Sequence, residues 1–255
     1  MLLAIDIGNS NVTFGIHDGS EWINHKRIRT VNNKTSDEYL VLFRDLLSQN
    51  GFEVKNIEHA IFCSVVPHLT VTFQNMIMEL IGELPLVVEP GIRTGIRIRT
   101  DNPVEVGSDL VANAVAAYEK NHSNSLIVDF GTALTFTAVA APGDLLGVVI
   151  APGLRSAIRA LVENTAQLPS VQLIPPPAAI GKNTIHSIQS GVIFGYVGLI
   201  EAIIRRMKKE LPSGHVDVIA TGGQAKIIAP LTAQFTLVDP LLTLEGLRII
   251  AERNR

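Results

Sequence analysis

The feature that most constrains this chain is a repeated pattern, in which a buried strand carries an aspartate and runs into a glycine turn. The first copy is AIDIGNSNVTFGI at residues 4–16, and the second is IVDFGTALTFTAV at residues 127–139. Each copy opens a run of three predicted strands that helices follow. Burying a carboxylate without a partner costs several kcal/mol, so two acids at equivalent places indicate a duplicated half-molecule with functional acids.

The residues of the two turns suit phosphate and hard cations. A glycine after the strand lets backbone N–H groups approach a phosphate, and carboxylates can hold a hydrated Mg²⁺ or another cation. Taken alone, Asp6 followed by Gly8-Asn9-Ser10-Asn11 favours a strand that ends in an ordinary tight turn. The second copy favours a nucleotide-phosphate site, with the two turns on opposite walls of a central cleft between the halves.

The remaining composition narrows the class of protein. A length of 255 residues fits one large domain or two of ordinary size. The polar stretch near residues 118–124 favours two domains, divided into 1–118 and 119–255. A last helix from about residue 241 could pack back on the first domain. A net charge of -3 with both signs dispersed argues against nucleic-acid binding. No apolar run approaches the roughly 18–20 residues of a membrane span, and we do not expect the N-terminal stretch to be a signal peptide. The single cysteine, Cys63, predicts a small core residue in a reducing cytoplasm.

Periodicity predicts an α/β fold in which each half has strands first and helices afterwards. Helices are expected over 35–50, 67–82, 153–165 and 184–211, and another begins near Asp109. Asp109 follows a glycine at that helix start, where it would serve equally as a cap or as a catalytic base. The stretch Gly181-Lys182-Asn183-Thr184 lacks the earlier glycine of a Walker A loop.

Seven short motifs occur in one order over nearly the whole chain: IDIGNSN (5–11), DNPVEVGSD (101–109), VDFGTA (128–133), IAPG (150–153), TAQLP (165–169), GKNT (181–184) and TGGQAKII (221–228). In these motifs the chain closely resembles the type III pantothenate kinases of the acetate and sugar kinase/Hsp70/actin superfamily. The resemblance implies two duplicated ribonuclease-H-like domains, the actin-like ATPase fold. It also implies ATP-dependent phosphorylation of pantothenate to 4′-phosphopantothenate, the first step of coenzyme A synthesis.

The resemblance also implies roles for individual residues. ATP and its phosphates would be bound by Asp6, Gly8, Asn9, Ser10, Asn11, Gly131, Thr132, Ala133, Gly222 and Gly223. Pantothenate would be bound by Gly107, Ser108, Asp109, Leu110 and Thr184, with Asp109 as the catalytic base. Asp6 would engage Mg²⁺, possibly through water, and Asp129 a monovalent cation, K⁺ or NH₄⁺. The family implies a cytoplasmic homodimer whose partner subunit supplies Thr184 to the pocket, with no nucleic-acid or membrane partner.

Two residues depart from the family pattern. Leu110 stands where the substrate motif normally has an arginine, and leucine cannot pair with a carboxylate. Losing such a charged contact would cost on the order of 2–3 kcal/mol of binding. The family usually has two adjacent glycines at positions 147 and 148. This chain keeps Gly147 and has Val148 in place of the second glycine. Two alternatives therefore stay open: a nucleotide-binding regulatory homologue without catalysis, and a kinase of another small alcohol.

Overall fold

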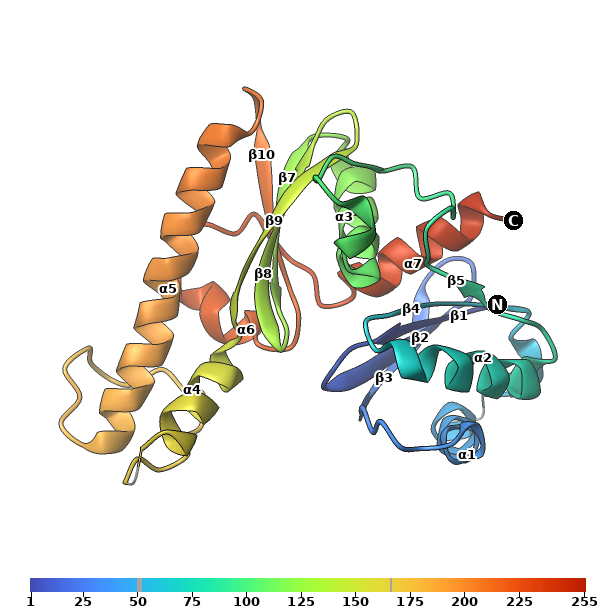
Figure 1. Cartoon of the computed structure of the whole chain (residues 1–255), viewed down its shortest axis with the longest axis horizontal. Helices are drawn as coiled ribbons and strands as arrows, with labels where there is room; N and C mark the ends of the chain where they lie inside the picture. Colours follow the sequence, from blue (N-terminus) through green and yellow to red (C-terminus); the bar gives the residue numbers. More distant parts are fainter. Residues whose placement is uncertain (50–51, 166) are drawn as a thin grey trace. The chain divides into compact units, whose positions relative to one another are not determined.

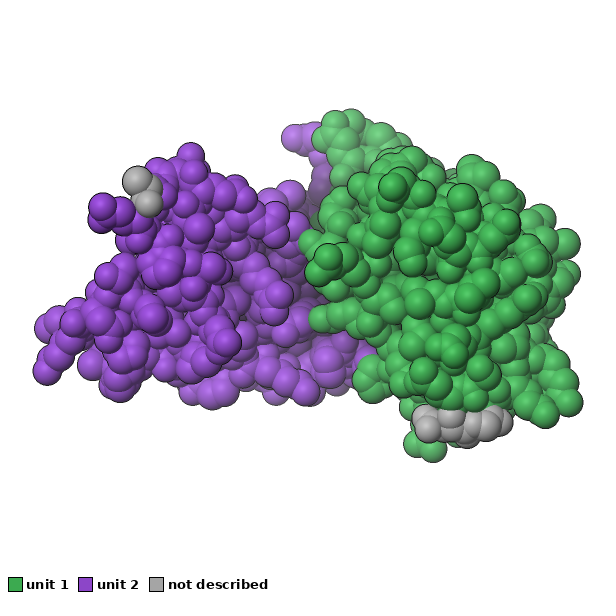
Figure 2. All heavy atoms as spheres, turned by 90° about the horizontal axis from the view of Figure 1, so that it is seen from below, with its two compact units in different colours: residues 1–95, 102–116, 242–255 green, residues 96–101, 117–241 purple. Residues whose placement is uncertain are grey.

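The structure is a computed structural model that describes residues 1–49, 52–165 and 167–255. Position 166, which belongs to the TAQLP motif at 165–169, therefore lies outside the described residues. Two compact units divide the chain (Figure 2). Unit 1 contains residues 1–95, 102–116 and 242–255, and unit 2 contains residues 96–101 and 117–241.

Unit 1 is built on a five-stranded sheet with the order β3-β2-β1-β4-β5 (Figure 1). Its strands are β1 (Leu2–Ile7), β2 (Asn11–His17), β3 (Trp22–Arg29), β4 (His59–Ser64) and β5 (Leu86–Val87). Helices α1 (Ser36–Ser48) and α2 (Pro67–Ile81) pack on one face, where alternate strand residues such as Ile5 and Phe14 join the core. Thr35 and Glu38 form a capping box at the start of α1, and Gly82 ends α2 in the left-handed conformation.

The last helix, α7 (Leu242–Arg253), belongs to unit 1 and contacts β1, β2 and β4. Gly246 lets α7 approach the backbone of Ala112 in α3 (Ser108–Asn121), because a Cβ at this position would collide with the Ala112 carbonyl. Thr243 Oγ1 donates a hydrogen bond to Asn113 Oδ1 at 2.8 Å. The final helix thereby anchors the first half of α3, which carries Asp109.

Unit 2 repeats the same strand order and adds one strand. Its sheet has the order β11-β10-β7-β8-β9-β6, in which β9-β8-β7-β10-β11 corresponds to β3-β2-β1-β4-β5. The strands are β6 (Arg97–Ile98), β7 (Asn124–Phe130), β8 (Ala133–Ala140), β9 (Asp144–Pro152), β10 (Val216–Thr221) and β11 (Leu237–Val238). Helices α4 (Leu154–Glu163), α5 (Thr184–Glu210) and α6 (Ala225–Ile228) contribute to the core of this unit. The duplication predicted from the repeat is confirmed.

Two sequence-based expectations need correction. The strands β6 and β11 were not predicted, because two-residue strands carry no readable periodicity. In addition, α5 contains an 18-residue stretch apolar enough to cross a membrane by length and composition. Scattered glycine and polar residues hide this stretch from a search for an unbroken apolar run. A core helix of a water-soluble protein passes the same test, so α5 decides nothing about membranes.

Candidate functional site

The first Asp-x-Gly turn joins β1 to β2 and is tied down by the end of β3. The Gly8 N–H donates to the Asn11 carbonyl at 3.0 Å, and Thr30 bonds to both sides of the turn. Its Oγ1 donates to the Gly8 carbonyl at 2.6 Å, and its N–H donates to the Ser10 carbonyl at 3.1 Å. A Cβ at Gly8 would lie only 3.1 Å from the Asn11 oxygen, so glycine suits this turn.

Asp6 lies directly before this turn, beside a buried thiol. Parallel pairing of β1 and β4 sets Asp6 opposite Cys63, and the Cys63 Sγ–H donates to Asp6 Oδ1 at 3.4 Å. Burial raises the pKa of the Cys63 thiol well above its ordinary value, and the charges of Asp6 and Asp109 raise it further. Cys63 is therefore a neutral donor close to two carboxylates.

The predicted substrate motif begins α3 on the same side of unit 1. Ser108 Oγ donates to the Ser64 carbonyl at 3.1 Å, which ties this helix start to the end of β4. Asp109 Oδ1 accepts from the Leu110 N–H at 2.8 Å. Burial raises the pKa of Asp109 more than its backbone hydrogen bonds lower it. A Cβ at Gly107 would collide with the Asp109 carboxylate. Leu110 is buried, with 8% of its surface exposed.

The second turn joins β7 to β8 in unit 2, and α4 holds it. The Gly153 N–H and the Ser156 Oγ both donate to the Thr132 carbonyl, at 3.1 and 2.9 Å. A Cβ on Gly153 would lie about 2.5 Å from the Thr132 oxygen and 2.6 Å from the Gly131 oxygen. Glycine at the start of α4 thus allows the helix to close against the turn. Ala133, the last residue of the turn motif, begins β8.

The predicted adenosine motif meets the second acid. Gly222 follows β10 with a φ of +87°, and a Cβ there would press against Asp129 Oδ1 and the backbone of Phe130. Glycine is therefore required for both its conformation and its close approach to β7. Gly223 is exposed beside it. Unit 2 brings the predicted cation acid, phosphate turn and adenosine motif together.

Thr184 and Val148 lie elsewhere in unit 2. Thr184 is exposed at the first position of α5, where the Asn183 side chain accepts the His186 N–H at 2.8 Å. Val148 lies in β9 opposite Thr137 of β8. The roles of Thr184 and Val148 in a substrate pocket stay predictions.

Sequence reasoning missed several residues that organise the turns. Cys63 was expected to be a core residue only, and Thr30 and Ser156 were not selected at all. Nothing in their local sequence marks them, because their partners lie between 22 and 57 positions away along the chain. The pairing of β1 with β4 would have been the one signal for Cys63.

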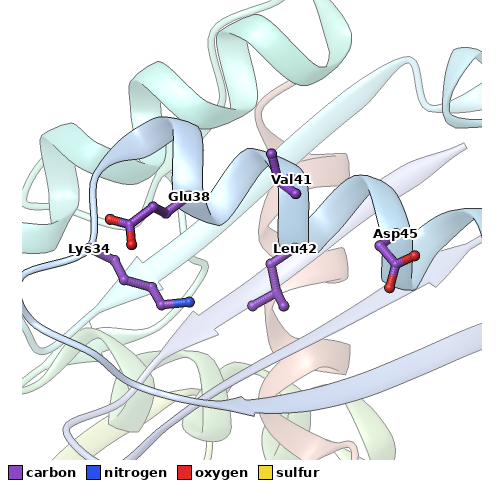
Figure 3. Close-up of a pocket in the computed structure, with 5 residues that line it drawn as sticks. All are labelled: Lys34, Glu38, Val41, Leu42 and Asp45. Atoms are coloured by element: carbon purple, nitrogen blue, oxygen red, sulfur yellow. The ribbon is translucent and has the colours of Figure 1, made fainter.

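A separate surface pocket of about 500 Å³ lies along α1 of unit 1 (Figure 3). Its lining residues are Lys34, Glu38, Val41, Leu42 and Asp45. None of them belongs to the predicted motifs, and the pocket combines two acids with a lysine and aliphatic groups. We assign no part of the phosphoryl-transfer site to it.

Comparison with known proteins identifies relatives of this chain. A family model described as type III pantothenate kinase matches residues 2–206. A protein of Moorella thermoacetica named type III pantothenate kinase is 46% identical to this chain over 254 residues. The matched region covers 100% of this chain and 100% of that protein. Among solved structures, component A of (R)-2-hydroxyglutaryl-CoA dehydratase from Acidaminococcus fermentans has a TM-score of 0.55 at 12% identity, with 100% of this chain and 99% of that chain covered. MreB 5 of Spiroplasma citri, bound to AMPPNP, has a TM-score of 0.52 at 11% identity, with coverage of 98% and 96%. These two structures support the actin-like ATPase fold.

Proposed function

The chain belongs to the type III pantothenate kinase family, and from that premise we propose how it transfers a phosphoryl group from ATP to pantothenate, the first step of coenzyme A synthesis. One observation carries the proposal: in unit 1, Asp6 and Asp109 both lie close enough to Cys63 for their charges to raise the pKa of its thiol. A kinase needs one acid at the phosphate end of the reaction and another at the acceptor hydroxyl. Asp6 and Asp109 supply this pair.

Asp109 is the base that receives the proton of the pantothenate hydroxyl as that oxygen attacks the γ-phosphorus and ADP leaves. Its position at the start of α3 is fixed by Ser108, which bonds to the end of β4, and by α7 behind the helix. A carboxylate whose pKa is raised by burial is a better proton acceptor than an ordinary aspartate. The turns at 8–11 and 131–133 and the turn at Gly222-Gly223 are the candidates for binding ATP through their backbone N–H groups.

The acids of the two turns fit two different cations. Among the described residues, no group of three or more His, Cys, Asp or Glu side chains is placed to hold a metal by itself. Mg²⁺ keeps several waters and is commonly bound by one or two carboxylates plus substrate phosphates, which suits Asp6. Asp129 fits a monovalent cation, because a buried hydroxyl oxygen lies on the strand opposite it. These ions would neutralise charge on the phosphate oxygens.

Leu110 makes recognition of the pantothenate carboxylate the weakest part of the site. The side chain is buried and can donate no hydrogen bond. We expect Leu110→Arg to lower the KM for pantothenate about tenfold with kcat little changed, since it restores a charged contact. Leu110→Met is the matched control, because it keeps an apolar side chain of similar volume. An unchanged KM in Leu110→Arg would mean that other residues bind the carboxylate.

A homodimer through α5 is supported by the outer face of this helix. Gly191, Gly195 and Gly198 are exposed, and a Cβ at each would meet no atom of the described residues within 4 Å. Small residues at this spacing let a second helix approach closely. Thr184 at the start of α5 would then lie near the partner subunit. Light scattering should give a dimer mass for the native chain and a smaller mass for Gly195→Leu.

The substrates are small cytosolic metabolites, so we place the enzyme in the cytoplasm, without a membrane or nucleic-acid partner. The direct test is incubation of the purified protein with ATP, Mg²⁺, K⁺ and pantothenate, with ADP and 4′-phosphopantothenate both measured. Equal amounts of the two products support the proposal. ATP binding without product at millimolar pantothenate would instead support a regulatory homologue, and product only from another alcohol would support a different kinase.

A further inference from the structure

Unit 2 has a buried oxygen close to the second acid that has no hydrogen-bond partner among the described residues. Among the described residues, Thr135 Oγ1 is buried and makes no hydrogen bond. Thr135 lies on β8 directly opposite Asp129 of β7, and directly opposed residues of antiparallel strands point to the same face of a sheet. Leaving a buried hydroxyl unsatisfied destabilises the folded state, so an unpartnered oxygen at this place needs an explanation.

The duplicated half of the molecule shows how the same position is satisfied elsewhere. Thr13 of β2 lies opposite Asp6, as Thr135 lies opposite Asp129. The next strand of unit 1 places Arg27 beside Thr13, and Arg27 Nε donates to Thr13 Oγ1 at 3.3 Å. The next strand of unit 2 has Ile150 at that register. An isoleucine cannot donate, so the second half has lost the protein donor and kept the hydroxyl.

The charge beside Thr135 decides what can take the place of that donor. Asp129 is an acid on the same face, and Gly222 approaches its Oδ1 from the other side. A phosphate oxygen would be repelled by this carboxylate, whereas a cation would be attracted by it. A neutral hydroxyl oxygen is a usual ligand for a weakly hydrated monovalent cation, which loses its water more readily than Mg²⁺ does.

We infer that Thr135 Oγ1 is a ligand of the monovalent cation at Asp129, in place of the arginine that satisfies Thr13 in the other half. The inference rests on the cation role proposed above for Asp129. It identifies a neutral oxygen, supplied by β8, as a determinant of cation affinity. The same oxygen can accept a hydrogen bond from NH₄⁺, so the site would serve either ion.

The test compares Thr135→Val with the native chain in K⁺ and in choline. Valine keeps the shape of threonine and removes the oxygen, so we expect the K⁺ concentration for half-maximal activity to rise about tenfold or more. Thr135→Ser should stay within about threefold of the native value. Thr13→Val is the matched control from the duplicated half, and its K⁺ requirement should match that of the native chain.

Thermal unfolding gives a readout independent of activity. A bound cation raises the unfolding temperature of the native chain as K⁺ replaces choline, by mass action. In choline, Thr135→Val should unfold at the same or a higher temperature than the native chain, because it removes an unsatisfied hydroxyl. In K⁺ the order should reverse. Should valine prevent folding, Thr135→Ala and Thr135→Ser allow the same comparison.

Two negative results have different meanings. If K⁺ neither activates nor stabilises the native chain, the proposed cation role of Asp129 fails, and the inference fails with it. If K⁺ acts on the native chain and Thr135→Val responds at the same K⁺ concentrations, only the inference about Thr135 is overturned.

Discussion

The two Asp-x-Gly turns share one scaffold and differ in most of the residues that surround each acid. Asp6 and Asp129 each lie opposite a threonine on the next strand, within the same strand order. The first turn spans residues 8–11 and the second spans residues 131–133, so the first is one residue longer. On the other side, Asp6 is paired with Cys63 and Asp129 with Thr221.

The residues that follow these neighbours differ as well. Ser64 follows Cys63 and uses its hydroxyl at the start of α2, where it accepts the Val66 N–H at 3.1 Å. Gly222 follows Thr221 and closes against Asp129. Asp109 also raises the pKa of Cys63 in unit 1. The two halves therefore share a similar frame around each acid and differ in the neighbours of that acid. Under the proposed function, the neighbours of Asp6 would serve the substrate and those of Asp129 the nucleotide base.

The largest effect should come from the acid that only the first half possesses. Replacing Asp109 with asparagine removes the proposed base, and we expect kcat to fall about a thousandfold while ATP binding persists. In the native enzyme, kcat/KM should decline as pH falls through the pKa of Asp109, which burial raises from the ordinary aspartate value. Steady-state kinetics against pH measures both effects.

Asp37→Asn is the control for that variant. Asp37 also lies in the first turn of a helix, but it is exposed on α1, so its loss should leave kcat unchanged. A kcat for Asp109→Asn within tenfold of the native value would remove Asp109 as the base.

The next test exchanges each turn acid for its amide. Asp6→Asn should raise the Mg²⁺ concentration needed for half-maximal activity, and Asp129→Asn should raise the K⁺ concentration, each by about a hundredfold. Cation titrations of both variants, with the other ion saturating, separate the two roles. If both variants lose the response to the same ion, Asp6 and Asp129 do not bind different cations, and the proposed difference between the halves is wrong.

Gly222→Ala tests the close approach that only unit 2 uses. Alanine in the left-handed conformation costs about 1 kcal/mol, and its Cβ would force the turn away from Asp129. We expect the KM for ATP to rise about tenfold and the free energy of unfolding to fall by about 2–3 kcal/mol. Kinetics and urea unfolding measure these changes.

Gly147→Ala is the matched substitution, because a Cβ at Gly147 meets no atom of the described residues within 4 Å. Its effect on unfolding should stay within about 0.5 kcal/mol. Equal losses in Gly147→Ala and Gly222→Ala would show that the close packing of Gly222 contributes nothing.

The sequence was sufficient for what is local and repeated. The Asp-x-Gly pattern predicted two equivalent halves, because alternation and turn residues are visible within a few positions. Asp6 and Asp129 both lie at the ends of core strands, as predicted. The motif order predicted the family, which the comparisons confirm.

The neighbours of each acid could not be predicted from the sequence, because they depend on strand register and on pairing between distant segments. An alignment of the two repeats without a gap places Thr13 one position away from Thr135, and only the ladders show that both oppose an acid. The donor Arg27 and its replacement Ile150 come from third strands, whose register the turns do not fix. The hydrogen bond of Cys63 to Asp6 was missed for the same reason, because it depends on the register of β1 and β4.

The smallest expected effect lies at the opposite end of the same strands, where His59 of β4 corresponds to Asp217 of β10. Burial alone would raise the pKa of Asp217. Side-chain hydrogen bonds from Asn121, Ser123 and His215 have the larger combined effect and lower the pKa overall. A depressed folded-state pKa stabilises the protein above the pKa of the unfolded chain, and the benefit is lost as pH falls through the folded-state pKa.

Asp217→Asn should therefore lower the free energy of unfolding by about 1–2 kcal/mol at pH 7, with a smaller difference near pH 3. The His59 side chain contacts Glu83 at 3.2 Å and both side chains are exposed, so His59→Asn should change the free energy of unfolding by less than about 0.5 kcal/mol. Urea unfolding of both variants at the two pH values measures this. A loss at pH 7 that persists undiminished at pH 3 would assign the role of Asp217 to packing, since its charge would then contribute nothing.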